Sequence, residues 1–168
     1  DGGFTHSGTL DPWELGVPNS GPAGAPSGVR VWATNLSGDY PNGVNARLDS
    51  PEIELPAGSS PSLSFRHFFE SDFGSDFGSV QISVNGRNFN DLPGVDEFSG
   101  SVTGGTYREF TADLTAFVGS TIRIRFLFTT DEIDGEMELG WYLDGFAVSG
   151  TRQALSLAFL DPAEDVDG

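Results

Sequence analysis

The chain of 168 residues contains no cysteine, no lysine and no long apolar run. Without cysteine, no disulfide can stabilise the fold, and the redox compartment cannot be read from the sequence. No apolar segment approaches the ~20 residues that a helix needs to cross a bilayer, so we expect no membrane insertion. A chain of this length buries roughly 70% of its unfolded surface on folding, which is enough for a stable core without disulfides.

Positive charge is scarce as well. All eight basic residues are arginine, against 25 acidic residues, which gives a formal net charge of −17. A field of this sign repels nucleic acid and anionic membranes and attracts cations, so we expect no nucleic-acid partner. Two compatible explanations remain open: an acidic, halophilic surface, as in proteins that work in high salt, and binding of multivalent cations.

Glycine (23 residues) and proline (10 residues) are frequent, and no segment has a sustained helical period. Short alternating segments between turn signals predict antiparallel strands with one solvated face. Strands are expected at 5–7, 13–15, 29–33, 47–53, 63–69, 79–84, 88–92, 107–114, 122–128 and 139–148, with one helical turn within 114–118. The sequence therefore predicts an all-β fold, an antiparallel β-sandwich or jelly roll.

The end of the chain differs in composition. We assign residues 1–152 to the β-sandwich module. Residues 153–168 would form a last strand or begin an acidic linker to a further domain, because 161–168 are rich in Asp and Glu. The start at Asp1, without a visible signal peptide, indicates a processed or excised piece of a longer protein.

Polar oxygen atoms lie at the ends of two apolar, strand-like runs. Asn35 and Asp39 follow the strand at 29–33 in a glycine-containing turn, and Asp144 interrupts the apolar run 139–148. A buried carboxylate without a partner is costly. Asp144 is therefore expected to bind a metal ion, to accept hydrogen bonds from a turn or to pair with an arginine. His67 lies on an apolar strand face, where a core histidine is expected rather than a metal ligand.

Aromatic residues offer a second kind of site. Jelly rolls often bind carbohydrate through exposed aromatic rings, and Trp13, Tyr40 and Tyr142 are the candidate ligand-binding residues. Tyr107 is a further ring to consider. Trp32 and Trp141 sit within strand-like runs, which favours core packing for both.

One motif raises an enzymatic alternative. Glu132, Asp134 and Glu136 have the E-x-D-x-E spacing that resembles jelly-roll glycosidases of the laminarinase type, in which paired carboxylates cleave the glycosidic bond. Gly135 weakens a strand where such a site needs rigidity, and the motif lies in an acidic, loop-like run. We therefore expect a solvated loop and no enzyme activity.

The order of the segments resembles that of the MAM-like jelly-roll modules attached to secreted bacterial peptidases of the immune inhibitor A type. Such modules also occur beside subtilisin-like peptidases. The resemblance covers roughly residues 4–150. It is carried by WELGVP (13–18), the segment 28–40, LDSPEI (48–53), LSFRHFFE (63–70), DFGSV (76–80), DLTAFVG (113–119), IRF (124–126) and GWYLDGFAV (140–148). The chain departs from that pattern at Asp144-Gly145, where two acids are usual, and at Phe89, where tryptophan is common.

The resemblance implies a non-catalytic accessory domain, often with a structural calcium ion. The matching ligands would be Asn35, Asp39 and Asp144, with Glu70 as a further candidate, and Ca²⁺ is the expected cofactor because it prefers oxygen ligands. The expected location is secreted or at the cell surface. The expected partners are other domains of the same polypeptide and extracellular protein or polysaccharide, through adhesion or substrate presentation.

Overall fold

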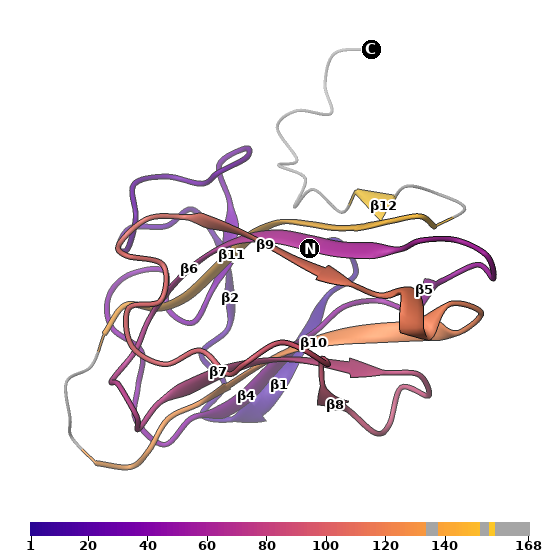
Figure 1. Ribbon diagram of the computed structural model, residues 1–168. Coiled ribbons are helices and arrows are strands. Elements are labelled where there is room, and N and C mark those ends of the chain that lie inside the picture. Colours follow the sequence, from indigo (N-terminus) through magenta and orange to yellow (C-terminus); the bar gives the residue numbers. More distant parts are fainter. Residues whose placement is uncertain (134–137, 152–154, 157–168) are drawn as a thin grey trace.

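The computed structural model describes residues 1–133, 138–151 and 155–156, and it consists of two antiparallel β-sheets packed face to face (Figure 1). The first sheet has the order β1 (Thr5–Thr9), β4 (Asn45–Asp49), β10 (Thr121–Thr129), β7 (Phe77–Ser83) and β8 (Asn90–Asp91), and β5 (Ile53–Glu54) also pairs with β10. The second has the order β2 (Glu14–Gly16), β3 (Val31–Ala33), β11 (Gly140–Ser149), β6 (Ser62–Glu70) and β9 (Arg108–Asp113), and β12 (Leu155–Ser156) also pairs with β11. The predicted all-β sandwich is confirmed.

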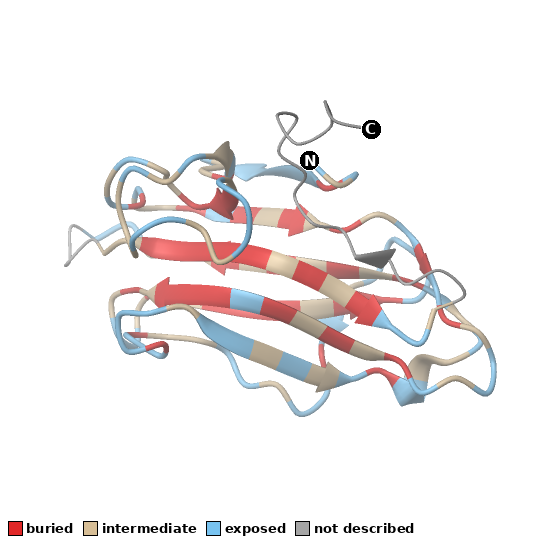
Figure 2. Ribbon diagram, turned by 90° about the horizontal axis from the view of Figure 1, so that it is seen from above, coloured by how far each residue is buried: buried red, intermediate tan, exposed pale blue. Residues whose placement is uncertain are grey.

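Strand β10 shows why the first sheet has one buried face. Ile122, Ile124, Phe126 and Phe128 are buried, whereas the residues between them are partly exposed. Because side chains alternate between the two faces of a strand, this spacing places all four side chains against the second sheet. Each contributes about 1.5–3 kcal/mol by leaving water. Figure 2 shows buried residues concentrated in the central strands.

The second sheet is covered on its outer face too. Val31, Ala33, Phe68 and Tyr142 form a second apolar cluster there. A glycine- and proline-rich segment, which we call the cover loop (residues 18–30), lies on this face (Figure 1). The Oγ of Ser20 and the hydroxyl of Tyr142 are 2.8 Å apart, and the Tyr107 hydroxyl donates to the Gly24 carbonyl at 3.3 Å. The cover loop thus packs on β11 from outside.

The predicted strands are found with shifted ends and one division. The segment expected as one strand at 47–53 forms β4 and β5. Between them, Ser50 bonds to Ile124 of β10 through both its backbone N–H and its Oγ, at 2.8 and 2.9 Å. The expected helical turn is the 3₁₀ helix η1 (Thr115–Phe117). Strand β12 lies within 153–168, where a last strand was one of two expectations, and the boundary at residue 152 stays a prediction. No helix in the described part of the chain has the length and apolarity needed to span a membrane.

Candidate functional site

Asp144 has a hydrogen-bonded partner in the cover loop. The residue lies in β11 and is only 1% exposed. Its carboxylate accepts hydrogen bonds from the backbone N–H of Ser27 at 2.6 Å, from the Ser27 Oγ at 3.0 Å and from the backbone N–H of Gly145 at 2.7 Å. Hydrogen bonds from a loop are one of the three kinds of partner that the sequence left open, and metal binding by Asp144 stays a prediction. Burial, and next the negative charge of Asp144, raise the pKa of Tyr107, which lies in the same region.

Asn35 and Asp39 lie together in the turn after β3. The Asn35 Nδ2 donates to the Asp39 carbonyl at 2.8 Å, and the Asn35 Oδ1 accepts from the backbone N–H of Ser37 at 2.9 Å. The side-chain amide of Asn35 is therefore engaged in holding the turn, whereas the side chain of Asp39 is exposed.

Glu70 is the last residue of β6, whereas Asp144 lies near the middle of the neighbouring strand β11. The register of β6 and β11 pairs Glu70 with Gly140 and Arg66 with Asp144. Four residues separate these pairs, so the two carboxylates belong to positions roughly 13 Å apart. Since calcium ligands lie about 2.3–2.6 Å from the ion, one ion cannot be held by both. In the described part of the chain, no three His, Asp or Glu side chains are grouped closely enough to hold a metal. Calcium binding stays a prediction.

The three aromatic residues predicted to contact a ligand are buried, and that prediction is wrong for this conformation. Trp13 is 2% exposed, and Tyr40 and Tyr142 are fully buried. Trp13 packs against Trp141, and Tyr142 packs edge-on against Phe68 in the outer cluster. A ring enclosed in this way presents no face to a sugar. The expectation that Trp32 and Trp141 are core residues is confirmed.

A second buried carboxylate, Asp76, was not singled out from the sequence. Its Oδ2 accepts a hydrogen bond from the Tyr40 hydroxyl at 2.6 Å, and its Oδ1 accepts one from the backbone N–H of Asp131 at 2.9 Å. The Tyr40 hydroxyl also accepts from the backbone N–H of Asp72 at 2.9 Å. Burial, followed by the bond to Asp76, raises the pKa of Tyr40, so the phenol stays protonated. This network ties together three connecting segments at one end of the sandwich.

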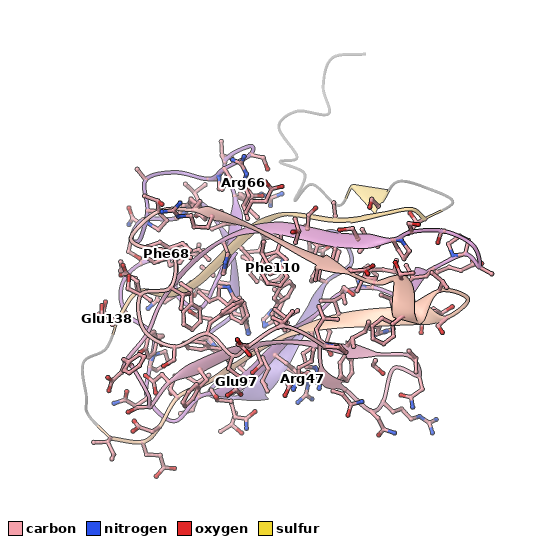
Figure 3. The ribbon with its side chains drawn as sticks, viewed as in Figure 1. Arg47, Arg66, Phe68, Glu97, Phe110 and Glu138 are labelled. Atoms are coloured by element: carbon pink, nitrogen blue, oxygen red, sulfur yellow. The ribbon has the colours of Figure 1, made fainter. Side chains whose placement is uncertain are left out.

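Beside this network lies a cavity with an exposed ring at its margin. The cavity has a volume of about 330 Å³, and its lining residues are Glu70, Ser71, Asp72, Phe73, Gly100, Ser101 and Glu138. Figure 3 shows Glu138 at this end of the molecule. Phe73 is 82% exposed, the highest value among the large apolar side chains described. It stands in the connection between β6 and β7, within the first of two consecutive Ser-Asp-Phe-Gly sequences.

His67 is a core residue, as expected, but it is not fully hydrogen-bonded. It lies within a set of aromatic rings, and its Nδ1 has no hydrogen-bond partner. Burial alone lowers the pKa of His67 to about 4, so the imidazole is neutral at pH 7. A neutral ring without a carboxylate or metal partner serves packing rather than proton transfer.

The enzymatic motif is only partly within the described residues. Glu132 lies in the connection after β10 and is exposed. Asp134 and Glu136, the other two members of the motif, lie outside the described residues.

In sequence, the chain is similar to part of a bacterial peptidase. No known protein-family model matches the chain. Over 150 residues, or 88% of its length, the chain is 37% identical to a segment of Bacillopeptidase F from Bacillus subtilis (strain 168). That segment is 10% of the peptidase, so the chain spans about a tenth of the curated relative it matches. The MAM-like assignment stays a prediction.

Two solved structures share the fold. One is TmCBM61 in complex with beta-1,4-galactotriose, with a TM-score of 0.57 and 16% identity over 86% of each chain. The other is the K3 cleaved adhesin domain of Lys-gingipain from Porphyromonas gingivalis W83, with a TM-score of 0.57 and 19% identity over 88% of this chain and 92% of that one. The chain is thus an antiparallel β-sandwich that is similar in sequence to a small segment of a bacterial peptidase and similar in fold to these two domains.

Proposed function

We propose that the chain is a non-catalytic accessory module of a longer, secreted or cell-surface bacterial polypeptide. Its partner would be another domain of that polypeptide or an extracellular protein or polysaccharide. The observation that carries the proposal is the 37% identity to a segment that makes up only 10% of a peptidase. Nine tenths of that relative lie outside the matched segment and leave ample room for a separate catalytic domain.

The use of the buried carboxylates supports a structural rather than a chemical role. Asp76 and Asp144 are the acidic side chains buried among the described residues, and each accepts hydrogen bonds that fix connecting segments. General acid–base chemistry needs a titratable group within reach of a substrate. Neither carboxylate has that access, because both are enclosed by the loops that they hold.

The proposal is tested in the longer polypeptide, assayed with and without residues 1–152. We expect hydrolysis of a short soluble peptide to be unchanged by the deletion, and hydrolysis of a polymeric or surface-bound substrate to decrease. Loss of short-peptide hydrolysis in a folded deletion variant would overturn the proposal. A coding sequence that holds no further domain would overturn it too. The isolated chain is expected to release no sugar from β-glucan, which also tests the glycosidase alternative at Glu132, Asp134 and Glu136.

Carbohydrate binding is a second candidate, and Phe73 is the observation that favours it. Its ring is exposed at the margin of the 330 Å³ cavity, where carboxylates of Glu70 and Asp72 could accept bonds from sugar hydroxyls. The fold likeness to TmCBM61 adds no binding residue at 16% identity. A glycan array with the chain and its Phe73→Ala variant decides the matter: retention lost in the variant supports this candidate, and no retention of the parent chain removes it.

Calcium binding belongs to the proposal as a stabilising contribution. It is supported by the net charge of −17 and by the exposed Asp39 in the turn that Asn35 holds. Backbone carbonyls would have to complete the coordination, since calcium takes about six to eight oxygen ligands. Asp144 and Glu70 would not contribute to the same site, given their separation along β6 and β11.

A further inference from the structure

A groove lies between the outer edges of the two sheets, next to β9. Its volume is about 570 Å³, within the range of ligand sites in proteins. Its lining comes from β9 and from the connection between β8 and β9, and the apolar lining residues are Val95, Phe98, Val102, Phe110 and Ala112. Its charged lining residues are all acidic: Asp96, Glu97 and Asp113. We call this feature the β9 groove.

The strand beside the groove has one unpaired edge. Among the described strands, β9 pairs with β6 alone, and it is the outermost strand of its sheet (Figure 2). The lining segment opposite β9 is attached to the other sheet, because Phe98 and Gly78 of β7 exchange two backbone hydrogen bonds, at 2.8 and 2.9 Å. An unpaired strand edge presents backbone N–H and C=O groups that another extended chain can pair with.

The charge of the groove selects against a second copy of this chain. Hydrogen bonds from Thr115 lower the pKa of Asp113, so its carboxylate remains ionised well into the acidic range. Glu97, labelled in Figure 3 together with Phe110, accepts a hydrogen bond from the Ser79 Oγ at 3.2 Å. Two molecules that each carry −17 repel one another. A partner with positive side chains is instead attracted to the rim.

We infer that the β9 groove binds an extended peptide segment in which apolar residues alternate with arginine or lysine, and that this segment adds as a strand to β9. Successive side chains of a strand point to opposite sides, so apolar residues would face Phe98, Phe110 and Val102 while basic residues face the acidic rim. Hydrogen bonds between the peptide backbone and β9 would supply affinity, and the alternation of apolar and basic side chains in the peptide would supply specificity. The inference rests on the proposed function, because it names the site and the partner chemistry of a binding module.

The packing of the aromatic lining residues favours a peptide over a sugar. The ring of Phe110 is stacked on Phe65 with centroids 4.6 Å apart, and Phe98 packs edge-on against Trp141 at 5.6 Å. These rings are held in the core and only partly exposed. Flexible aliphatic side chains can follow such a surface, whereas a sugar needs an open ring face on which to stack.

The test uses fluorescently labelled eight-residue peptides and measures their anisotropy with the chain. The probe alternates arginine and valine. One comparison peptide carries N-methyl groups on alternate backbone amides, and another replaces arginine by glutamate. We expect the probe to bind at least tenfold more tightly than the N-methylated peptide and the glutamate peptide not to bind. Hydrogen exchange of the β9 amides should slow when the probe is added.

Two matched double variants locate the binding. Asp96→Asn with Glu97→Gln removes two rim charges, and we expect at least a fivefold weaker affinity. Glu52→Gln with Glu54→Gln removes two charges outside the groove lining and should change the affinity less than twofold. All four side chains are exposed, so both variants should fold.

Three outcomes overturn the inference: no binding of the probe, equal binding of the N-methylated peptide, or equal weakening by both double variants. The last two would mean attraction to the acidic surface as a whole. None of these outcomes affects the proposed accessory function, which fails instead if deletion of the module abolishes short-peptide hydrolysis.

Discussion

Two carboxylates and one histidine are buried among the described residues, and the carboxylates offset the cost of burial differently from the histidine. Asp144 accepts hydrogen bonds from the cover loop, and Asp76 accepts them from Tyr40 and from the backbone of Asp131. His67 instead remains neutral, with an unpaired Nδ1. A buried charge without partners would destabilise the fold by several kcal/mol. The two carboxylates therefore hold loops in place, and the histidine makes the core sensitive to acid.

Replacing Asp144 with asparagine is expected to destabilise the chain whether or not calcium is present. The amide is uncharged and has one oxygen, whereas the carboxylate accepts from the Ser27 N–H with Oδ2 and from the Gly145 N–H with Oδ1. Hydrogen bonds to charged groups contribute about 1.5–3 kcal/mol, and the unfolding free energy should fall by about that amount. Urea denaturation with calcium and with chelator measures it, and Asp96→Asn, at an exposed carboxylate outside the predicted calcium ligands, is the control. Destabilisation seen only with calcium would instead make Asp144 a metal ligand.

The pH dependence of stability is expected to carry a component from His67. Its pKa is about 4 in the folded chain, against an ordinary value of 6.5. Between these values the unfolded chain binds a proton that the folded chain does not, so stability is lost as the pH falls from 6.5 towards 4, by up to roughly 3 kcal/mol. Above pH 6.5 this component is fully present.

The variant His67→Phe isolates that component, because the other titrating groups are common to both proteins. The difference in unfolding free energy between variant and parent should change between pH 6.5 and 4 in favour of the variant, and it should be level above pH 6.5. Parallel pH profiles would mean that the imidazole takes up its proton in the folded state without penalty.

At the scale of elements, alternation in the sequence located the strands but not their neighbours. In β10 one face is apolar and the other polar, and the strand was evident from that pattern. In β11 most residues are buried on both faces, because the cover loop packs on the outside. An apolar pattern in the sequence indicates that a face of a strand is buried, but it does not indicate which segment covers that face. Ser27, which lies 117 positions from Asp144, therefore could not be assigned as its partner.

Gly78 in β7 is expected to be among the least replaceable glycines of the sandwich. A Cβ at this position would lie 2.5 Å from the Phe69 ring and 2.9 Å from the Trp141 ring. Both rings are fully buried and cannot move aside freely, so Gly78→Ala should cost about 1–3 kcal/mol or more through overpacking. Thermal or urea unfolding provides the measurement.

Gly16→Ala is the matched control for Gly78→Ala. Its Cβ would meet only the end of the Leu36 side chain, which can rotate away, so a small effect is expected. Equal destabilisation by the two variants would show that loss of glycine, rather than contact with the rings, is responsible.

At the scale of the whole molecule, the composition gives the net charge but does not show whether the acidic residues form a cation site. The net charge of −17 is distributed over much of the chain, and no described group of three acidic or histidine side chains gathers around one point. The predicted ligands could be chosen from residue type and position at strand ends. Their separation could not, because it depends on the register of β6 with β11. The distance between two residues on neighbouring strands follows from the register of those strands, which the sequence alone does not give.

The melting temperature is expected to rise with sodium chloride from 0.05 to 2 M, even with chelator present. Self-repulsion of a chain with −17 destabilises the compact state at low ionic strength. The screening length shrinks from ~10 Å at 0.1 M to ~3 Å at 1 M, so the effect should continue into the molar range. A flat or falling melting temperature would mean that the acidic surface is not an adaptation to salt.

Calcium is expected to add a separate, saturating rise in melting temperature. An ion that binds only the folded chain stabilises it by RT ln(1 + [L]/Kd), or about 2.7 kcal/mol at a hundredfold excess over Kd. This rise should be complete by low millimolar calcium at constant ionic strength. If calcium and magnesium act alike and only as salts do, the predicted site does not exist.

The position of β10 and β11 in their sheets has a consequence for the order in which the module can be made. Each is a central strand: β10 lies between β4 and β7, and β11 lies between β3 and β6. Both come from the last third of the chain, so a ribosome releases the sheet edges first and the strands that join them last. Until residue 149 has emerged, β3 and β6 have no common neighbour, and their apolar side chains remain exposed. The nascent module therefore completes its second sheet in one late step, and we expect a chain that stalls before Gly140 to remain incompletely folded rather than to form a smaller sandwich.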